Sequence, residues 1–331
     1  MNGNLEIRPL NDSDLQAAVD MAWENYMLER SYNSALQELE RNNFLYQEIE
    51  RLIQKGIGCI ALKEGEPVGF LCFGELFDIN DNGGKGAASP LWGYGIRGSN
   101  RGEIIGKLFQ TVAATSCERY AESLRVSVYA HDLEVLKMYI MSSFAMDVTD
   151  VIRGTEEEVD INSTGAITFK ELTKVELLAY KEEVLNLYRE LINHLRQSPV
   201  FYHCSYFLPI EKRFDDFISD DMRIFAAFDM DKFIGMIDSE PSDVTFAKGD
   251  TESTGMGDVF VNTAYRGKGI AAELLNFAID RLRESGIKRI YVTHGTINPT
   301  ARGFWDKYFS NYSYTMTREI DPDMLGVIER V

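Results

Sequence analysis

The chain has 331 residues, of which 45% are hydrophobic, and a formal net charge of −18 at pH 7. This length corresponds to about two domains, no run of about 18 apolar residues predicts a membrane span, and so acidic a chain repels the phosphate backbone of nucleic acids. The N-terminus carries no basic and apolar leader, and the cysteines follow neither disulfide-framework nor metal-ligand spacing. We therefore expect a cytoplasmic protein with no bound metal, no nucleic-acid partner and no membrane contact, and its oligomeric state stays open.

The first half of the chain alternates strand and helix patterns. Asn11-Asp12-Ser13-Asp14 is a helix N-cap signal. Apolar spacing predicts, in chain order, a strand at 5–9, a helix at 35–54, paired strands at 57–62 and 68–73, a helix at 104–120 and a strand at 124–130.

The second half repeats this order after a polar segment at 154–165, whose three consecutive acids predict a solvated linker. The repeat predicts two domains of one plan, at 1–153 and 166–331. The elements expected in the second domain are a strand at 167–169, helices at 175–194 and 210–218, paired strands at 223–228 and 233–237, a strand at 259–261, a helix at 270–284 and a strand at 288–293.

The segment with the most specific chemistry joins an apolar strand to the following helix. Gly267 and Gly269 lack a Cβ, so an anion can lie directly on the main chain. A helix N-terminus offers unpaired N–H groups and the positive end of a dipole, and Arg266 and Lys268 add positive charge at the same place. The pattern predicts a cradle for a pyrophosphate, and a plain tight turn with a helix cap is the alternative.

Two other glycine-rich motifs fit this segment less well. A P-loop requires a hydroxyl residue after its lysine, whereas Gly269 follows Lys268. Gly267, Gly269 and Ala272 match the G-x-G-x-x-A spacing of dinucleotide-binding folds, but a polar stretch separates the strand from the first glycine. No acidic residue ends the next strand to bind a ribose. A nicotinamide-binding enzyme is therefore the minor alternative.

The spacing R-x-x-G-x-A at residues 266–271 resembles the R/Q-x-x-G-x-G/A motif of the GNAT superfamily of acetyltransferases. A second segment, at 298–307, resembles the family's N-x-x-A-x-x-x-Y-x-K pattern, with Asn298, Ala301 and Lys307 in register. The resemblance implies the fold class α/β (α+β), as two tandem GNAT-like domains. Each would be a mixed, mostly antiparallel central sheet flanked by helices.

The resemblance also implies an activity, which is acetyl-CoA-dependent N-acetyl transfer to a primary amine of a small molecule or peptide. The active site would lie in residues 166–331. A protein of the same fold that binds CoA or a partner without turnover is the alternative. Carried onto this chain, the coenzyme-binding residues are Val259, Phe260, Val261, Arg266, Gly267, Lys268, Gly269, Ile270, Ala271, Asn298 and Trp305.

Acetyl transfer requires that the amine lose a proton and that the thiolate leave. Asp258 interrupts the apolar strand near the expected reaction centre, so we expect it to take the proton; a solvent-facing strand residue is the alternative. His294 is a second candidate base, or a hydrogen-bonded structural residue. The tyrosine acid of many family members falls on Trp305, which is no useful proton donor. Tyr308, on the same helix face, is predicted to substitute for it.

The first half is expected to be a degenerate copy. At an offset of 165 residues, Ile104 falls where Gly269 stands and Leu133 falls where Asn298 stands, although an Arg-Gly pair remains at 101–102. A β-branched side chain at the glycine position would separate the backbone from a phosphate. We therefore predict a GNAT-like domain that has lost tight acetyl-CoA binding.

The acceptor pocket is expected before the second strand pair. Residues 202–207 are rich in aromatic rings with polar tips, as a pocket wall would be. A core-packing link between helices is the alternative. Tyr188, Tyr202 and Tyr206 are the candidate wall residues.

Overall fold

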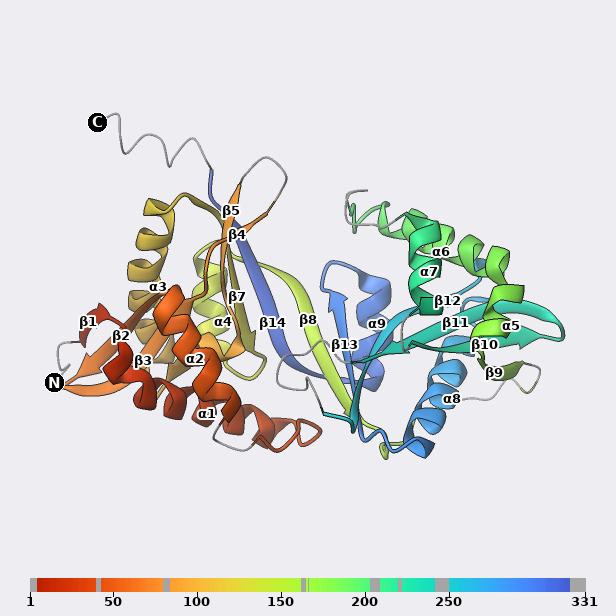
Figure 1. Cartoon of the computed structure of the whole chain (residues 1–331), viewed down its shortest axis with the longest axis horizontal. Helices are drawn as coiled ribbons and strands as arrows, with labels where there is room; N and C mark the ends of the chain where they lie inside the picture. Colours follow the sequence, from red (N-terminus) through yellow and green to blue (C-terminus); the bar gives the residue numbers. More distant parts are fainter. Residues whose placement is uncertain are drawn as a thin grey trace. The chain divides into compact units, whose positions relative to one another are not determined.

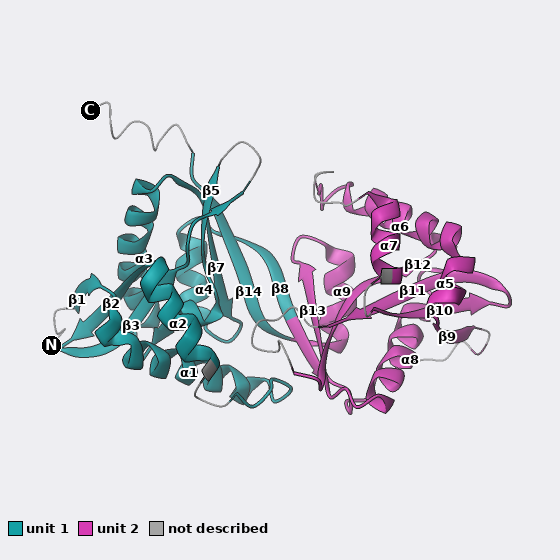
Figure 2. Ribbon diagram, viewed as in Figure 1, with its two compact units in different colours: residues 1–150, 311–331 teal, residues 151–310 magenta. Residues whose placement is uncertain are grey.

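The computed structural model describes residues 5–39, 43–79, 84–161, 165, 167–202, 209–219, 222–241 and 250–321 (Figure 1). The chain divides into two compact units (Figure 2). Unit 1 contains residues 1–150 and 311–331, and unit 2 contains residues 151–310.

Unit 1 has two runs of paired strands, in the orders β1-β2-β3-β6 and β4-β5-β7-β14-β8. The strands are β1 (Leu5–Pro9), β2 (Ile57–Lys63), β3 (Glu66–Phe73), β4 (Phe77–Asp78), β5 (Lys85–Ser89), β6 (Tyr94–Ile96), β7 (Ala121–Tyr129), β8 (Ala145–Gly154), which continues into unit 2, and β14 (Ser310–Glu319). The helices are α1 (Leu15–Tyr32), α2 (Asn43–Lys55), α3 (Arg101–Glu118) and α4 (Leu133–Met141).

Helices cover both faces of the first run of strands in unit 1. On one face, buried side chains of α1 and α2 pack with Ile60 of β2 and Phe70 of β3. On the other face, α3 lies so close that a Cβ added to Gly69 would meet Ile104 at 2.7 Å. The strand pair β2–β3 predicted from the sequence is confirmed.

The helix predicted at 35–54 is wrong in its first part, because α2 begins at Asn43. The chain leaves α1 at Tyr32, and the Asn33 side chain then accepts a hydrogen bond from the main-chain N–H of Ala35. Such side-chain turns compete with helix formation. Apolar spacing cannot show this competition.

Unit 2 has the strand order β13-β12-β11-β10-β9, in which only β12 and β13 pair in parallel. The strands are β9 (Thr168–Leu172), β10 (Arg223–Asp229), β11 (Lys232–Glu240), β12 (Ser253–Val261) and β13 (Arg289–Gly295). The helices are α5 (Lys174–Ala179), α6 (Lys181–Leu195), α7 (Ile210–Ser219), α8 (Ile270–Glu284) and α9 (Pro299–Tyr308).

The sheet of unit 2 lies between two hydrophobic clusters. The apolar face of α8, with Leu274, Ala278 and Leu282 at helical spacing, packs on one side together with residues of α9. Helices α6 and α7 pack on the other side, where Phe214 and Phe217 are fully buried (Figure 1). The predicted helix at 270–284 is confirmed, whereas the helix predicted at 175–194 is interrupted between α5 and α6.

The compact units differ from the expected domains at both boundaries. Thr155, in the expected linker, is buried and donates hydrogen bonds to main-chain oxygens of Ile287 and Lys288. At the other end, β14 pairs antiparallel with β7, from Ser313↔Tyr129 to Glu319↔Ser123. The C-terminal strand therefore belongs to unit 1. The strand pattern of this segment gives no sign of which sheet receives it.

Candidate functional site

A cavity of about 540 Å³ lies in unit 2 where β12 and β13 separate. The last register pair between the two strands joins Gly255 to Tyr291. Beyond it, residues 257–261 and 293–295 line the cavity, and helices α6, α7, α8 and α9 supply most of the remaining walls. The carboxyl ends of parallel strands are the usual ligand-binding edge of α/β sheets.

A β-bulge in β12 explains why the strands part. The register between β11 and β12 shifts between Ile237 and Ser239, where β12 has one extra residue. The Asp238 carboxylate accepts a hydrogen bond from the main-chain N–H of Asp258 at 3.0 Å. This N–H therefore has an acceptor although the bulge interrupts the strand pairing. Bulges bend a strand and re-aim its side chains.

Beyond the bulge, one edge of β12 is open to the cavity. The N–H groups of Asp258 and Asn262 point toward β11, where they donate to Asp238 and to the main-chain oxygen of Ile234. Main-chain groups alternate in direction along a strand. The N–H groups of Val259 and Val261 therefore point toward the cavity.

The N-terminus of α8 closes one end of the cavity with bare main-chain groups. Gly267 and Gly269 have φ values of 76° and 83°, which glycine adopts without strain. Within the described residues, the N–H groups of residues 267–271 donate to no protein acceptor, and intrahelical bonding begins with the N–H of Ala272. These five donors at the positive end of a helix dipole form a site for an anion.

The two basic side chains of the turn fold back onto the protein. The guanidinium of Arg266 lies 4.8 Å over the Phe260 ring, and its Nε donates to the main-chain oxygen of Val261 at 2.9 Å. Lys268 lies over the Tyr265 ring at 5.1 Å. The main chain is thus what the turn offers to a ligand, and Glu273, the acid in the first turn of α8, is buried.

Helix α9 supplies the wall opposite β12. Asn298 caps this helix by accepting hydrogen bonds from the N–H groups of Thr300 and Ala301 at 3.1 and 3.3 Å. Trp305 is buried and packs edge-on against Phe309, yet it also lines the cavity. Both residues have structural roles that position the wall.

The three catalytic candidates line the same cavity. The Asp258 side chain is 38% exposed; desolvation raises its pKa, and Arg213 opposes this rise. His294 is buried, with Nε2 3.4 Å from an Asp306 oxygen. Tyr308 is half-buried one turn after Trp305. Asp258 has the most favourable position for taking up a proton.

On the side where the acceptor is predicted to bind, residues of α6 and α7 and Tyr202 line the cavity. Tyr202 lines it, with its hydroxyl so close to Gly295 that a Cβ there would approach within 2.3 Å. Tyr188 lies near Arg213 and Asp258, and burial raises its pKa to about 12. Tyr206 lies outside the described residues.

The structure thus brings the predicted site residues together. Every coenzyme-binding and catalytic candidate lines the cavity except Lys268, and of the two described wall candidates Tyr202 lines it and Tyr188 does not. Their roles in binding and catalysis stay predictions. Sequence reasoning missed Arg213 and Asp238, although an acidic residue that ends the apolar run of β11 was a detectable signal.

Unit 1 corrects the predicted alignment of the two halves. Strand pairing places Ile96 at the position of Val261, but the following loop is four residues shorter, because α3 begins at Arg101 and α8 at Ile270. Asn100, with a φ of 62°, therefore stands where Gly269 does. The expected counterpart, Ile104, lies one turn inside the helix. An alignment of the two halves at a constant offset cannot show that one loop is shorter.

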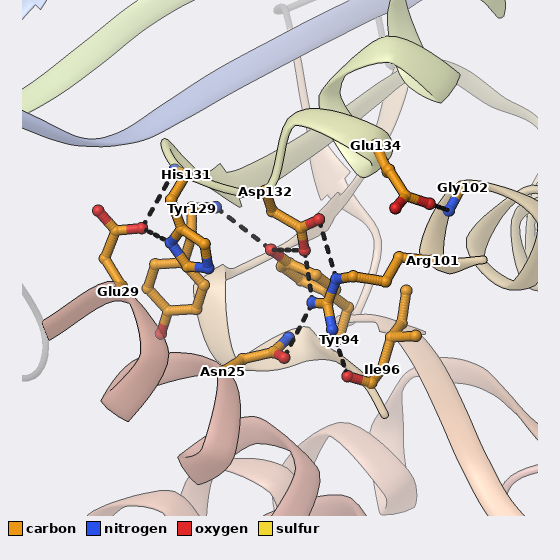
Figure 3. A network of polar contacts seen from close by, with 10 residues as sticks. All are labelled: Asn25, Glu29, Tyr94, Ile96, Arg101, Gly102, Tyr129, His131, Asp132 and Glu134. Carbon is orange, nitrogen blue, oxygen red and sulfur yellow. Dashed lines mark hydrogen bonds and ion pairs between the residues drawn. The ribbon is translucent and has the colours of Figure 1, made fainter. Parts of the chain in front are cut away.

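Side chains fill the corresponding place in unit 1 (Figure 3). Arg101 donates to both oxygens of Asp132, at 3.0 and 2.6 Å, and also to Asn25 and to the main-chain oxygen of Ile96. It thereby joins the end of β6 to the N-cap of α4. The hydroxyl of buried Tyr94 lies 3.3 Å from Asp132 and accepts from the N–H of Tyr129.

In unit 1, a carboxylate of the protein itself occupies the N-terminus of helix α3. The main-chain N–H of Gly102 donates to a carboxylate oxygen of Glu134 at 3.3 Å. The equivalent group in unit 2, the N–H of Ala271, has no protein acceptor in the described part of the chain. This difference supports the prediction that only the second half binds a coenzyme.

Metal-ligand groups and membrane-spanning helices are both absent from the described residues. No group of three or more His, Cys, Asp or Glu side chains is arranged there to hold a metal ion. In the same residues no helix has the length and apolar content needed to cross a bilayer.

Comparisons with known proteins agree with this geometry. Residues 186–310 match the sequence model of the Acetyltransferase (GNAT) family. The crystal structure of a GCN5-related N-acetyltransferase from Sphaerobacter thermophilus is similar to the chain, with 13% sequence identity, coverage of 96% of each chain and a TM-score of 0.53. A tandem GNAT protein from the clavulanic acid biosynthesis pathway is 12% identical over 96% of this chain and 98% of that chain, with a TM-score of 0.42. No curated protein matches the chain. The fold class predicted from the sequence is confirmed.

Proposed function

We propose that the protein is an acetyl-CoA-dependent N-acetyltransferase, because residues 186–310 match the sequence model of the Acetyltransferase (GNAT) family. Its acceptor is a primary amine of a small molecule or peptide, and its place of action is the cytoplasm. The reaction is direct attack of the amine on the thioester, in the cavity of unit 2.

The observation that carries the proposal is the set of bare N–H groups at residues 267–271, at one end of the cavity. A pyrophosphate needs several donors and positive potential, and this turn offers both. A Cβ added at Gly267 would meet no atom within 4 Å, so the surface of the turn is open.

The rest of the cavity suits the remainder of acetyl-CoA. The open edge of β12, at Val259 and Val261, can pair with the amides of a pantetheine arm, as an added strand would. Trp305, Phe304 and Ala301 offer apolar surface along that path. The residues present therefore fit the coenzyme, which when bound supplies the activated acetyl group.

The side chains around the reaction centre divide the remaining tasks. Asp258 takes the proton of the amine, and its raised pKa makes it a stronger base than an ordinary carboxylate. The N–H groups of β12 stabilise negative charge that develops on the carbonyl oxygen. Tyr308 donates a proton to the leaving thiolate, a modest task because a thiol has a pKa of about 8.5. His294, at the end of β13 with Nε2 3.4 Å from an Asp306 oxygen, is the second candidate base.

A purified-protein screen for thiol release tests the proposal. Acetyl-CoA and mixed primary amines should yield free thiol together with acetylated amine of the expected mass, and the Gly269→Asp variant should yield neither. Acetyl-CoA binding without thiol release over a broad amine panel would favour a non-catalytic binding protein. That alternative is supported by Trp305, which stands where many relatives have the tyrosine acid.

A further inference from the structure

A second carboxylate lies directly behind the proposed base. Asp238 has no exposed surface, and one of its oxygens accepts the main-chain N–H of Asp258. Its other oxygen, Oδ2, is buried without a hydrogen-bond partner among the described residues. A buried carboxylate oxygen with no donor is costly to keep ionised. Packing alone therefore does not explain why an acidic residue occupies this buried position.

The main chain is shaped around this carboxylate. A Cβ added at Gly257 would lie only 2.1 Å from Asp238 Oδ2, so no other residue fits there without displacing the acid. Gly257 and Asp258 are the residues of β12 at the bulge. Asp238 therefore holds the bend that directs Asp258 to the cavity.

The Arg213 guanidinium lies near the carboxylates of both Asp238 and Asp258. The Nη2 atom of Arg213 lies 3.9 Å from Asp238 Oδ2 and 3.9 Å from Asp258 Oδ2, too far for a direct hydrogen bond to either. Among the described residues, the other titratable groups that interact electrostatically with the pair are Tyr188 from α6 and Glu240 from β11. The ionised cluster thus carries more negative than positive charge.

The acid–base behaviour of the pair follows from burial and mutual repulsion. Desolvation, and then the charge of Asp258, raise the pKa of Asp238 well above its usual range, with Arg213 opposing the rise. Desolvation also raises the pKa of Asp258. Two interacting carboxyl groups lose their protons in separate steps, and Asp258 ionises first, because its charge is among the causes that raise the pKa of Asp238.

We propose that Asp238 is a positioning residue for the transfer reaction, which holds the bulge and stays neutral beside the ionised Asp258, so that Asp258 accepts the proton of an acceptor arriving as an ammonium ion. This inference rests on the proposed function of the cavity. In the step, an N–H bond of the ammonium breaks and an O–H bond forms on the Asp258 carboxylate, which leaves a neutral amine and a protonated carboxyl. A primary alkylamine is protonated near neutral pH, its pKa being about 10.

The variant Asp238→Asn separates charge from structure. An amide oxygen can still accept the Asp258 N–H, but the side chain can no longer ionise. Because Asp258 ionises while Asp238 is still neutral, we expect the acidic limb of the kcat/KM profile to stay in place. The control, Glu252→Gln, removes a charge next to β12 that pairs with Lys288, away from the cavity, and should also leave the limb in place. A limb that moves to lower pH in Asp238→Asn, but not in the control, would show that Asp238 is charged when Asp258 ionises and would overturn the proposal.

Carboxyl-carbon NMR of aspartate-labelled protein gives a readout that does not depend on turnover. In Asp258→Asn the Asp238 midpoint should fall, because the charge of Asp258 raises the pKa of Asp238. The Asp258 midpoint should stay unchanged in Asp238→Asn. Independent titration of the two groups would overturn the inference even in an active enzyme. Coupled titration without any acetyl transfer would contradict only the proposed function.

The same spectra test whether an ammonium ion binds beside Asp258. Added n-butylammonium should lower the Asp258 midpoint, because a cation favours the carboxylate, whereas n-butanol should not change it. No response to n-butylammonium at millimolar concentration would refute docking of the acceptor at this pair.

Discussion

A matched pair of substitutions at Gly269 tests whether the N-terminus of α8 binds the coenzyme. Gly269 has a φ of 83°, and Asn100 holds the same place in unit 1 with a φ of 62°. Asn and Asp tolerate this left-handed conformation better than other residues with a side chain. Gly269→Asn and Gly269→Asp are nearly equal in size and differ by one negative charge.

The magnitude follows from Coulomb's law. A carboxylate at residue 269 would stand about 5 Å from the nearest phosphate charge, and two unit charges at that separation repel by ~3 kcal/mol at an effective dielectric constant of about 20. That energy corresponds to roughly a 100-fold loss of affinity. The carboxylate also occupies helix donors by itself, as Glu134 does in unit 1.

Thermal unfolding with and without acetyl-CoA measures the loss. Ligand at about 100 times its Kd stabilises the folded state by ~2.7 kcal/mol, equivalent to a rise in Tm of about 5–10 °C for a unit of this size. Gly269→Asn should keep most of this rise, and Gly269→Asp should lose nearly all of it. Equal rises in Tm for the two variants would refute the reasoning.

The remaining predictions concern both units. Arg101→Ala leaves the buried Asp132 carboxylate without its guanidinium, so the free energy of unfolding should fall by about 3–5 kcal/mol in chemical denaturation; a change below about 1 kcal/mol would contradict the network. Calorimetry should give one acetyl-CoA per chain, and Glu134→Gln should leave that number unchanged; a second site would show that unit 1 is competent. Leu274→Ala, in the core beneath the cavity, should cost about 2–5 kcal/mol of stability, and a neutral effect would show that the core relaxes. Because the pKa of Asp258 is raised, activity should fall with decreasing pH at a higher pH than for an ordinary carboxylate, and Asp258→Asn should lose most activity at every pH; an unchanged rate would exclude Asp258 as the base.

The glycine turn and helix α8, where we propose that the coenzyme binds, were predictable from the sequence because they depend on local chemistry. Gly267 and Gly269 are required by main-chain conformation, and the helix that follows has strong apolar periodicity. Both signals are complete within a short segment. The predicted boundaries of α8 were therefore confirmed, and the glycines lie at its N-terminus.

The acceptor side was not predictable because it depends on contacts between distant segments. Asp238 and Asp258 meet only through the register of β11 and β12, and Arg213 reaches them from α7. Likewise, the pairing of β14 with β7 joins segments from opposite ends of the chain. Periodicity identifies each strand but gives no information about its partner.

Amide NMR of the two helix N-termini during a titration with acetyl-CoA tests the central claim most directly. The account predicts that the N–H resonances of residues 267–271 shift and that those of Arg101 and Gly102 do not. Unmoved resonances at 267–271, or shifts confined to Arg101 and Gly102, would contradict it.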